Sequence, residues 1–90
     1  MTQYEQSWRN QSEFFRNTLA NLTSEEIRQA AVGTGCASRL TGNAYHQIRC
    51  GNISDAVGTM KAGAGPEQHK KTRKRLRKNL TALIEAKESV

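Results

Sequence analysis

The sequence predicts an all-α fold, a small bundle of four to five helices. Three observations lead to this prediction. Apolar residues recur at the three- and four-residue steps of amphipathic helices. Signals typical of helix starts stand at Thr23 and Pro66. No stretch alternates apolar and polar residues with β-branched enrichment, as a strand would.

Length and charge divide the chain into two parts. Ninety residues, 36% of them hydrophobic, hold one domain with a limited core, for which dimerisation is a common remedy. The net charge is +6, but residues 1–66 hold six basic and five acidic residues, whereas residues 67–90 hold eight and three. We therefore expect a nearly neutral helical body over residues 1–65 and a basic helix over residues 66–90.

The first predicted helix carries an apolar stripe on one face. Tyr4, Trp8, Phe15, Leu19 and Leu22 follow one another at steps of four, seven, four and three residues, which fits a helical period. We expect this stripe to form core. The alternative is that part of it forms a homodimer seam, since so much aromatic area is hard to cover in a short chain.

The second helix is expected to begin at Thr23 and to end before a glycine-rich turn. Thr23 and Glu26 have the spacing of a capping box, in which each residue satisfies a backbone N–H of the other. Gly33-Thr34-Gly35 favours a left-handed stop. Between them, Ile27 and the Ala30-Ala31 pair supply a narrow apolar face.

A third helix is predicted from Ser38 to Cys50, with Leu40, Ala44 and Ile48 spaced four residues apart. Gly42 lies inside this interval and is unfavourable by about 1 kcal/mol relative to alanine. Gly51-Asn52 should close the helix.

The remaining chain predicts two further helices around a flexible joint. A short helix is expected over Ile53–Lys61 with Ser54 as its N-cap. Ala62–Gly65 is the joint, and Pro66 is suited to the first position of a last helix. That helix carries an apolar side and a basic remainder. The side consists of His69, Leu76, Leu80, Leu83 and Ile84.

Residues Glu26–Gly65 resemble the small Cro-type helix-turn-helix repressors of phages and plasmids. The residues that carry the resemblance are Ala30-Ala31, Gly35-Cys36 at the turn, and the segment from Asn43 to Ser54. The interval from Gly35 to Gly51 is longer than the usual one in that family. The resemblance implies a helix-turn-helix-like centre, a third helix that reads bases, and a role in transcription regulation.

Two groups of residues are candidates for nucleic-acid binding. The polar face of the third helix would read bases, because arginine suits guanine and asparagine or glutamine suits adenine; its alternative is an ordinary solvated face. This face contains Arg39, Asn43, His46, Gln47 and Arg49. The second group is a run of cations suited to phosphates of DNA or structured RNA. This run contains Lys70, Lys71, Arg73, Lys74, Arg75, Arg77 and Lys78.

The sequence offers little for catalysis or metal binding. His46 and Cys50 are spaced as i and i+4, but no Cys-x-x-Cys or close His pair accompanies them. We expect no cofactor, no metal and no enzymatic activity. With no secretory signal and no apolar run long enough to cross a bilayer, we expect a cytoplasmic protein whose Cys36 and Cys50 are free thiols.

These observations predict a nucleic-acid-binding regulatory protein, with duplex DNA as the favoured partner. Two alternatives stay open at this point. One is an inhibitor or adaptor whose basic helix occupies an acidic or nucleic-acid-binding surface of a larger protein complex. The other is an RNA-binding protein.

Overall fold

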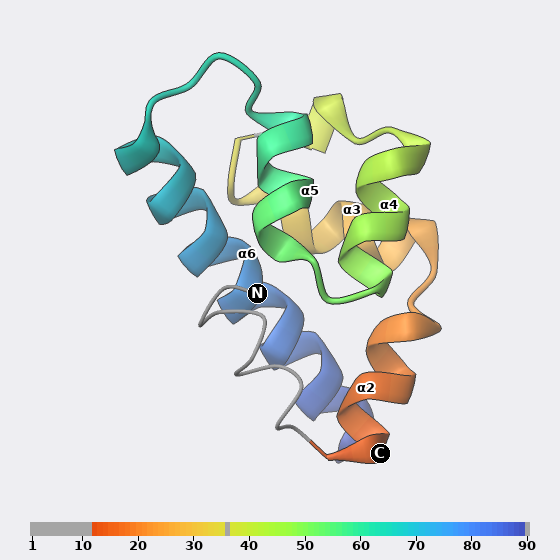
Figure 1. Ribbon diagram of the computed structural model, residues 1–90. Helices are drawn as coiled ribbons and strands as arrows, with labels where there is room; N and C mark the ends of the chain where they lie inside the picture. The colour runs from red at the N-terminus through yellow and green to blue at the C-terminus, as the bar shows by residue number, and fades with distance from the viewer. Residues whose placement is uncertain (1–11, 36, 90) are drawn as a thin grey trace.

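The computed structural model describes residues 12–35 and 37–89, and it confirms the all-α prediction (Figure 1). In this part of the chain, five α-helices and one 3₁₀ helix follow one another without a strand. They are α2 (Glu13–Ala20), α3 (Ser24–Val32), η1 (Ala37–Arg39), α4 (Gly42–Arg49), α5 (Ile53–Met60) and α6 (Pro66–Glu88).

Helix α2 corresponds to the second half of the first predicted helix. It is capped by Ser12, whose hydroxyl accepts from the Phe15 N–H at 3.2 Å, and it ends at Ala20. Phe15 and Leu19 are buried, as is Leu22 beyond the helix end. Because these three side chains fill the core of their own chain, they are not free for a dimer seam. Tyr4 and Trp8, the rest of the predicted stripe, lie outside the described residues.

Helix α3 begins and ends as predicted. The Thr23 N–H donates to Glu26 Oε1 at 2.9 Å, and the Glu26 N–H donates to Thr23 Oγ1 at 3.1 Å, which completes the capping box. After Val32 the backbone turns through Gly35, whose φ of 77° lies in the left-handed region that glycine adopts at little cost. Ile27 on the inner face is fully buried.

The predicted helix from Ser38 to Cys50 is wrong in its first third. Residues Ala37–Arg39 form a single 3₁₀ turn, and a new helix, α4, starts at Gly42. The reason is the Thr41 hydroxyl, which accepts from the Ala44 N–H at 3.4 Å and caps α4. Gly42 is therefore a first-turn residue, where the cost expected inside a helix does not apply. The predicted closure is confirmed, since Gly51 has a φ of 83°.

Helix α5 supplies a fully buried face, and its predicted N-cap is wrong. The cap position is Asn52, which makes no side-chain capping bond, and Ser54 is the second residue of the helix. Ile53, Val57 and Met60 are all fully buried. The hydrophobic contact of Ile53 at the first position sets where the helix begins.

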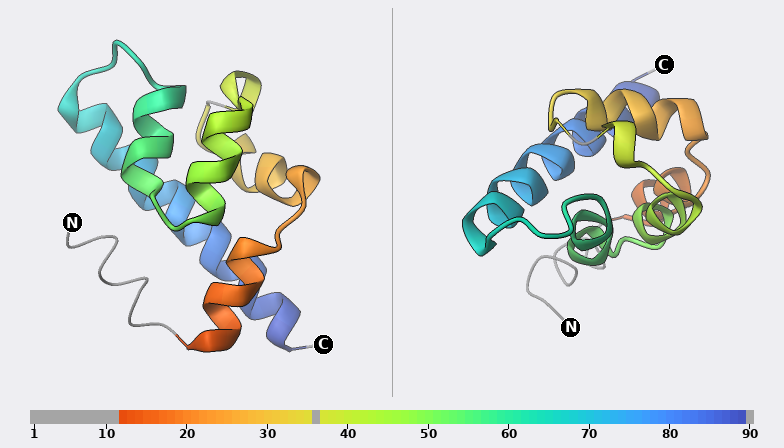
Figure 2. Two further views of the ribbon diagram at one scale, coloured as in Figure 1. Left: turned by 45° about the vertical axis from the view of Figure 1, so that its right-hand side comes forward. Right: turned by 90° about the horizontal axis from the view of Figure 1, so that it is seen from above.

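Helix α6 begins at Pro66, as predicted, and packs along α5, α3 and α2 (Figure 2). Thr72, Leu76, Leu80 and Ile84, spaced four residues apart, form its buried row. His69, near the N-terminal end of α6, is half-buried, and its Nε2 lies 2.9 Å from the Lys61 carbonyl oxygen. Since the buried leucines belong to the same hydrophobic cluster as the other helices, the basic helix shares one core with residues 12–65.

Candidate nucleic-acid interface

The basic face of α6 comprises the seven cations between Lys70 and Lys78. The buried row of α6 takes up one side of the helix, which leaves the other side to these residues. Lys70, Lys71, Lys74, Arg75 and Lys78 are exposed, whereas Arg73 and Arg77 border the buried row and are half-buried. The fold therefore brings all seven predicted phosphate-contacting residues onto one continuous surface.

Most of this positive charge has no carboxylate partner. Among the residues that the structure describes, Lys70, Lys71, Lys74 and Lys78 form no ion pair. Arg73 and Arg77 each have an interaction partner. Arg75 donates from a terminal nitrogen to the Gly33 carbonyl oxygen at 3.4 Å, which uses one of its five N–H groups. Within the described residues, the four lysines of the basic face thus keep their ammonium groups for solvent or for a ligand.

This concentration of charge is unfavourable for the free helix. Each lysine has like charges three or four residues away, and each such pair costs about 0.2–0.5 kcal/mol. At its ends the helix is not adverse to its dipole, because Glu67 lies in the first turn and Lys87 lies beside Glu88 in the last. Burial of Leu76 and Leu80, which stabilises by about 1.5–3 kcal/mol for each side chain, offsets these costs.

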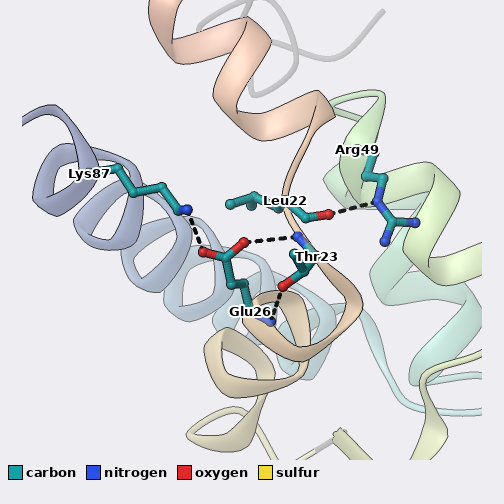
Figure 3. A network of polar contacts seen from close by, with 5 residues as sticks. All are labelled: Leu22, Thr23, Glu26, Arg49 and Lys87. Carbon is teal, nitrogen blue, oxygen red and sulfur yellow. Dashed lines mark hydrogen bonds and ion pairs between the residues drawn. The ribbon is translucent and has the colours of Figure 1, made fainter.

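Polar contacts of the second half of α6 hold it against α3. The Asn79 side-chain amide donates to the Ala30 carbonyl oxygen at 2.8 Å. Lys87 forms an ion pair with Glu26 at 2.6 Å, as Figure 3 shows. Neither Asn79 nor Lys87 is among the predicted site residues. The only sequence signal for either of them is that Asn79 directly follows the basic run, which ends at Lys78. They hold α6 in place, so that the basic face is presented on a helix that is already formed.

The Glu26 carboxylate takes part both in the cap of α3 and in the ion pair with Lys87 of α6. Hydrogen bonding to Lys87, together with the Thr23 backbone N–H, lowers the pKa of Glu26 below its ordinary value of 4.5. Because Glu26 is charged at neutral pH, the same side chain caps α3 and fixes the last turns of α6.

The residues predicted to read bases are divided by the structure. Arg39 in η1, and Asn43 and His46 on α4, are exposed. Gln47 is half-buried, and its Oε1 accepts from the Thr59 hydroxyl at 2.9 Å. Of these five residues, Arg49 makes the most contacts within the chain.

Arg49 holds the link between α2 and α3. Its Nε donates to the Leu22 carbonyl oxygen at 3.0 Å (Figure 3). A terminal nitrogen of the same side chain donates to Ser24 Oγ at 3.2 Å. Its guanidinium carbon also lies 5.6 Å from the centre of the Tyr45 ring, within cation–π range. Tyr45 in turn accepts from Arg28 through its hydroxyl at 3.2 Å, and this bond raises the pKa of Arg28. Arg49 therefore has a structural role.

Helix α4 and the basic face lie on opposite sides of the molecule. Helix α4 packs against α5, α2 and α3, whereas α6 covers another side of the same three helices. The views of Figures 1 and 2 agree that α5 lies between α4 and the first half of α6. A straight duplex therefore cannot lie against both surfaces at once without bending.

The thiol–imidazole pair is the nearest approach to a metal or catalytic site. Cys50 is free and exposed, and its Sγ lies 3.6 Å from His46 Nε2. In residues 12–35 and 37–89, no three His, Cys, Asp or Glu side chains gather as metal ligands would. Cys36, the other thiol, is outside the described residues. None of the helices in these ranges is both long enough and apolar enough to cross a bilayer.

Comparison with known proteins adds no relative to this description. No protein-family model matches the chain, and no curated protein or solved structure is similar to it. Proposals about function therefore depend on the chemistry of the surfaces described above.

Proposed function

We propose that this protein binds nucleic acid, with duplex DNA as the favoured ligand, through the basic face of α6. The observation that carries the proposal is the set of four exposed lysines that have no carboxylate partner in residues 12–35 and 37–89, held on a helix that the core has already ordered. Phosphate groups would neutralise the crowded charge and release counterions, which is the main source of affinity in such complexes. The contacts would be largely independent of base sequence.

Duplex ligands are favoured over single strands because α6 has no aromatic residue. Proteins that bind single strands stack bases on aromatic side chains, and residues 66–90 contain no Phe, Tyr or Trp. Structured RNA shares the phosphate chemistry and is the second ligand to test.

A regulatory role through base reading by α4 is the finer part of the proposal. It rests on the resemblance to Cro-type repressors and on the exposed Arg39, Asn43 and His46. Because Gln47 and Arg49 make contacts within the chain, α6 is favoured as the main binding surface. We expect α4 to contribute less of the binding free energy.

The proposal is tested by measuring binding to labelled duplex DNA, single-stranded DNA and structured RNA across a series of salt concentrations. Wild-type protein should bind duplex DNA at low salt with a steep salt dependence. The variant Lys74→Gln/Lys78→Gln should flatten the slope of log K against log salt by up to about 2 units, or about 0.9 for each lost phosphate contact.

A charge-matched control separates a local surface from general positive charge. Arg16→Gln/Arg28→Gln also removes two exposed cations, but from α2 and α3. It should leave the slope nearly unchanged. If the wild type binds none of the three nucleic acids at low salt, the proposal is wrong, and capture of an acidic protein partner becomes the explanation for the basic face.

A further inference from the structure

Two shallow hollows lie along the exposed side of α6, and Lys74 and Lys78 line both of them. The hollow on the α3 side, which we call the α3-side hollow, is lined by Lys71, Lys74, Arg75, Lys78 and Asn79. The opposite hollow is lined by Lys74, Arg77, Lys78, Thr81, Ala82 and Glu85. The first contains only cations and an amide, whereas the second contains a carboxylate.

The side chains on the α3 side are oriented before any ligand binds. Asn79 donates to the Ala30 carbonyl oxygen at 2.8 Å, and Arg75 donates to the Gly33 carbonyl oxygen at 3.4 Å, so both side chains are directed toward the C-terminal end of α3. An arginine held in this way loses less conformational entropy when it grips a ligand, and its planar fork suits two oxygens of one phosphate. Arg75 is exposed, which leaves its remaining N–H groups accessible.

A further cation, Lys61 at the end of α5, extends the positive charge near this hollow. The ammonium group of Lys61 is 4.0 Å from the position that a Cβ on Gly35 would occupy. It therefore lies against the same Gly33–Gly35 turn that Arg75 contacts. The turn thus has a cation from the end of α5 as well as one from α6 beside it.

Glu85 has the opposite effect on the other hollow. Its carboxylate is exposed and lines the hollow with Lys78 and Arg77. It repels a phosphate and attracts the same cations that a phosphate would need. The two sides of α6 are therefore unequal, although cations are present on both.

We infer that the α3-side hollow is a phosphate subsite, which takes a phosphodiester group of the nucleic-acid backbone on the fork of Arg75. Lys71, Lys74 and Lys78 supply the neutralising charge. This inference rests on the proposed function and adds to it the side of α6 along which the backbone runs.

Two matched pairs of variants test the subsite in the full-length protein, with a labelled DNA duplex as the probe. Lys71→Gln and Lys70→Gln each remove one exposed, unpaired charge from adjacent positions, but only Lys71 lines the hollow. Arg75→Lys and Arg77→Lys each keep the charge and remove the fork. We expect Lys71→Gln and Arg75→Lys to weaken binding by roughly tenfold and their partners by about twofold or less.

A third variant tests the role of the carboxylate. Glu85→Gln should strengthen binding by about two- to threefold, because it removes the repulsion from the opposite hollow. Thermal unfolding of each variant checks that α6 remains in place. If Arg75→Lys weakens the contact with Gly33, the subsite is judged from the difference between Lys71→Gln and Lys70→Gln.

The outcomes separate the subsite from the function. Equal weakening within both pairs, with wild-type binding intact, overturns the subsite and leaves the proposed function standing. Absence of wild-type binding at low salt overturns both.

Discussion

Helices α4 and α6 both carry cationic and polar side chains at the surface, but these side chains differ in the contacts that they make within the chain. On α4, Arg49 donates to Leu22 and Ser24, and Gln47 accepts from Thr59. On α6, four lysines between Lys70 and Lys78 form no ion pair among the described residues. Arg49 on α4 is used for the fold, whereas these four lysines of α6 carry charge that the described part of the chain does not pair.

The comparison shows that a polar residue at a solvent-facing position is a weak sign of binding until its own contacts are known. Arg49 satisfies the backbone carbonyl of Leu22 in the link between α2 and α3, so its loss would leave that acceptor unmet. Lys74 forms no ion pair with any residue that the structure describes, and its presence adds repulsion. An unfavourable charge that no internal contact explains is therefore the stronger functional signal.

The largest expected effect on stability concerns Arg49. Arg49→Ala removes the bonds to Leu22 and Ser24 and should lower the free energy of unfolding by about 2 kcal/mol, measured by urea denaturation. The control is Arg39→Ala, at an exposed position of η1, which should change stability by less than about 0.5 kcal/mol. Equal losses in the two variants would mean that Arg49 has no structural role.

The next effect concerns Glu26, which joins the cap of α3 to α6. Glu26→Ala removes both and should cost about 1 kcal/mol. Glu26→Gln can keep the capping bond, so it should lose only the ion pair, about 0.5 kcal/mol, because the Lys87 side chain is 40% exposed. A double-mutant cycle with Lys87→Gln checks that the loss belongs to this pair.

The pH dependence of the same pair has a defined sign. Since the pKa of Glu26 is lowered in the folded state, its contribution is present above the ordinary value of 4.5 and is lost as the pH falls below that value through the folded pKa. The difference in unfolding free energy between wild type and Glu26→Gln should therefore be constant near neutrality and shrink in acid. A difference that persists below the folded pKa would contradict the ion pair as its source.

A smaller effect on the free energy of unfolding, an increase rather than a loss, is expected from a substitution on the basic face. Lys74 has like charges at Lys70, Lys71, Arg77 and Lys78, so Lys74→Gln should raise the free energy of unfolding by about 0.5 kcal/mol while it weakens DNA binding. Lys74→Arg keeps the charge and should change neither. Added salt should reduce the difference in stability. If Lys74→Gln destabilises the protein, the basic face is part of the fold and the comparison with α4 fails.

The smallest effect is expected from the exposed part of α4. Asn43→Ala/His46→Ala should change affinity for duplex DNA by less than about twofold, because phosphate contacts by α6 carry the binding. Binding to a panel of DNA sequences measures whether preference is altered. A preference lost at one base pair, worth about 1–3 kcal/mol, would instead support base reading by α4.

Much of the helical architecture follows from local signals. The capping box at Thr23 and Glu26, the glycine at position 35 and the proline at position 66 each define a boundary that the structure confirms. These signals succeed because they depend on atoms a few residues apart, whose geometry changes little with the rest of the fold. The cationic run between Lys70 and Lys78 is likewise evident from composition alone.

The sequence by itself therefore determined the helical class, the start of α3 and of α6, and the presence of a basic helix. Tertiary structure decided that Arg49 is engaged within the chain and that α4 and the basic face point to opposite sides. The physical reason is that these features depend on contacts between residues far apart in the chain, such as Arg49 with Leu22 and Asn79 with Ala30. No local pattern encodes which distant carbonyl a side chain will reach.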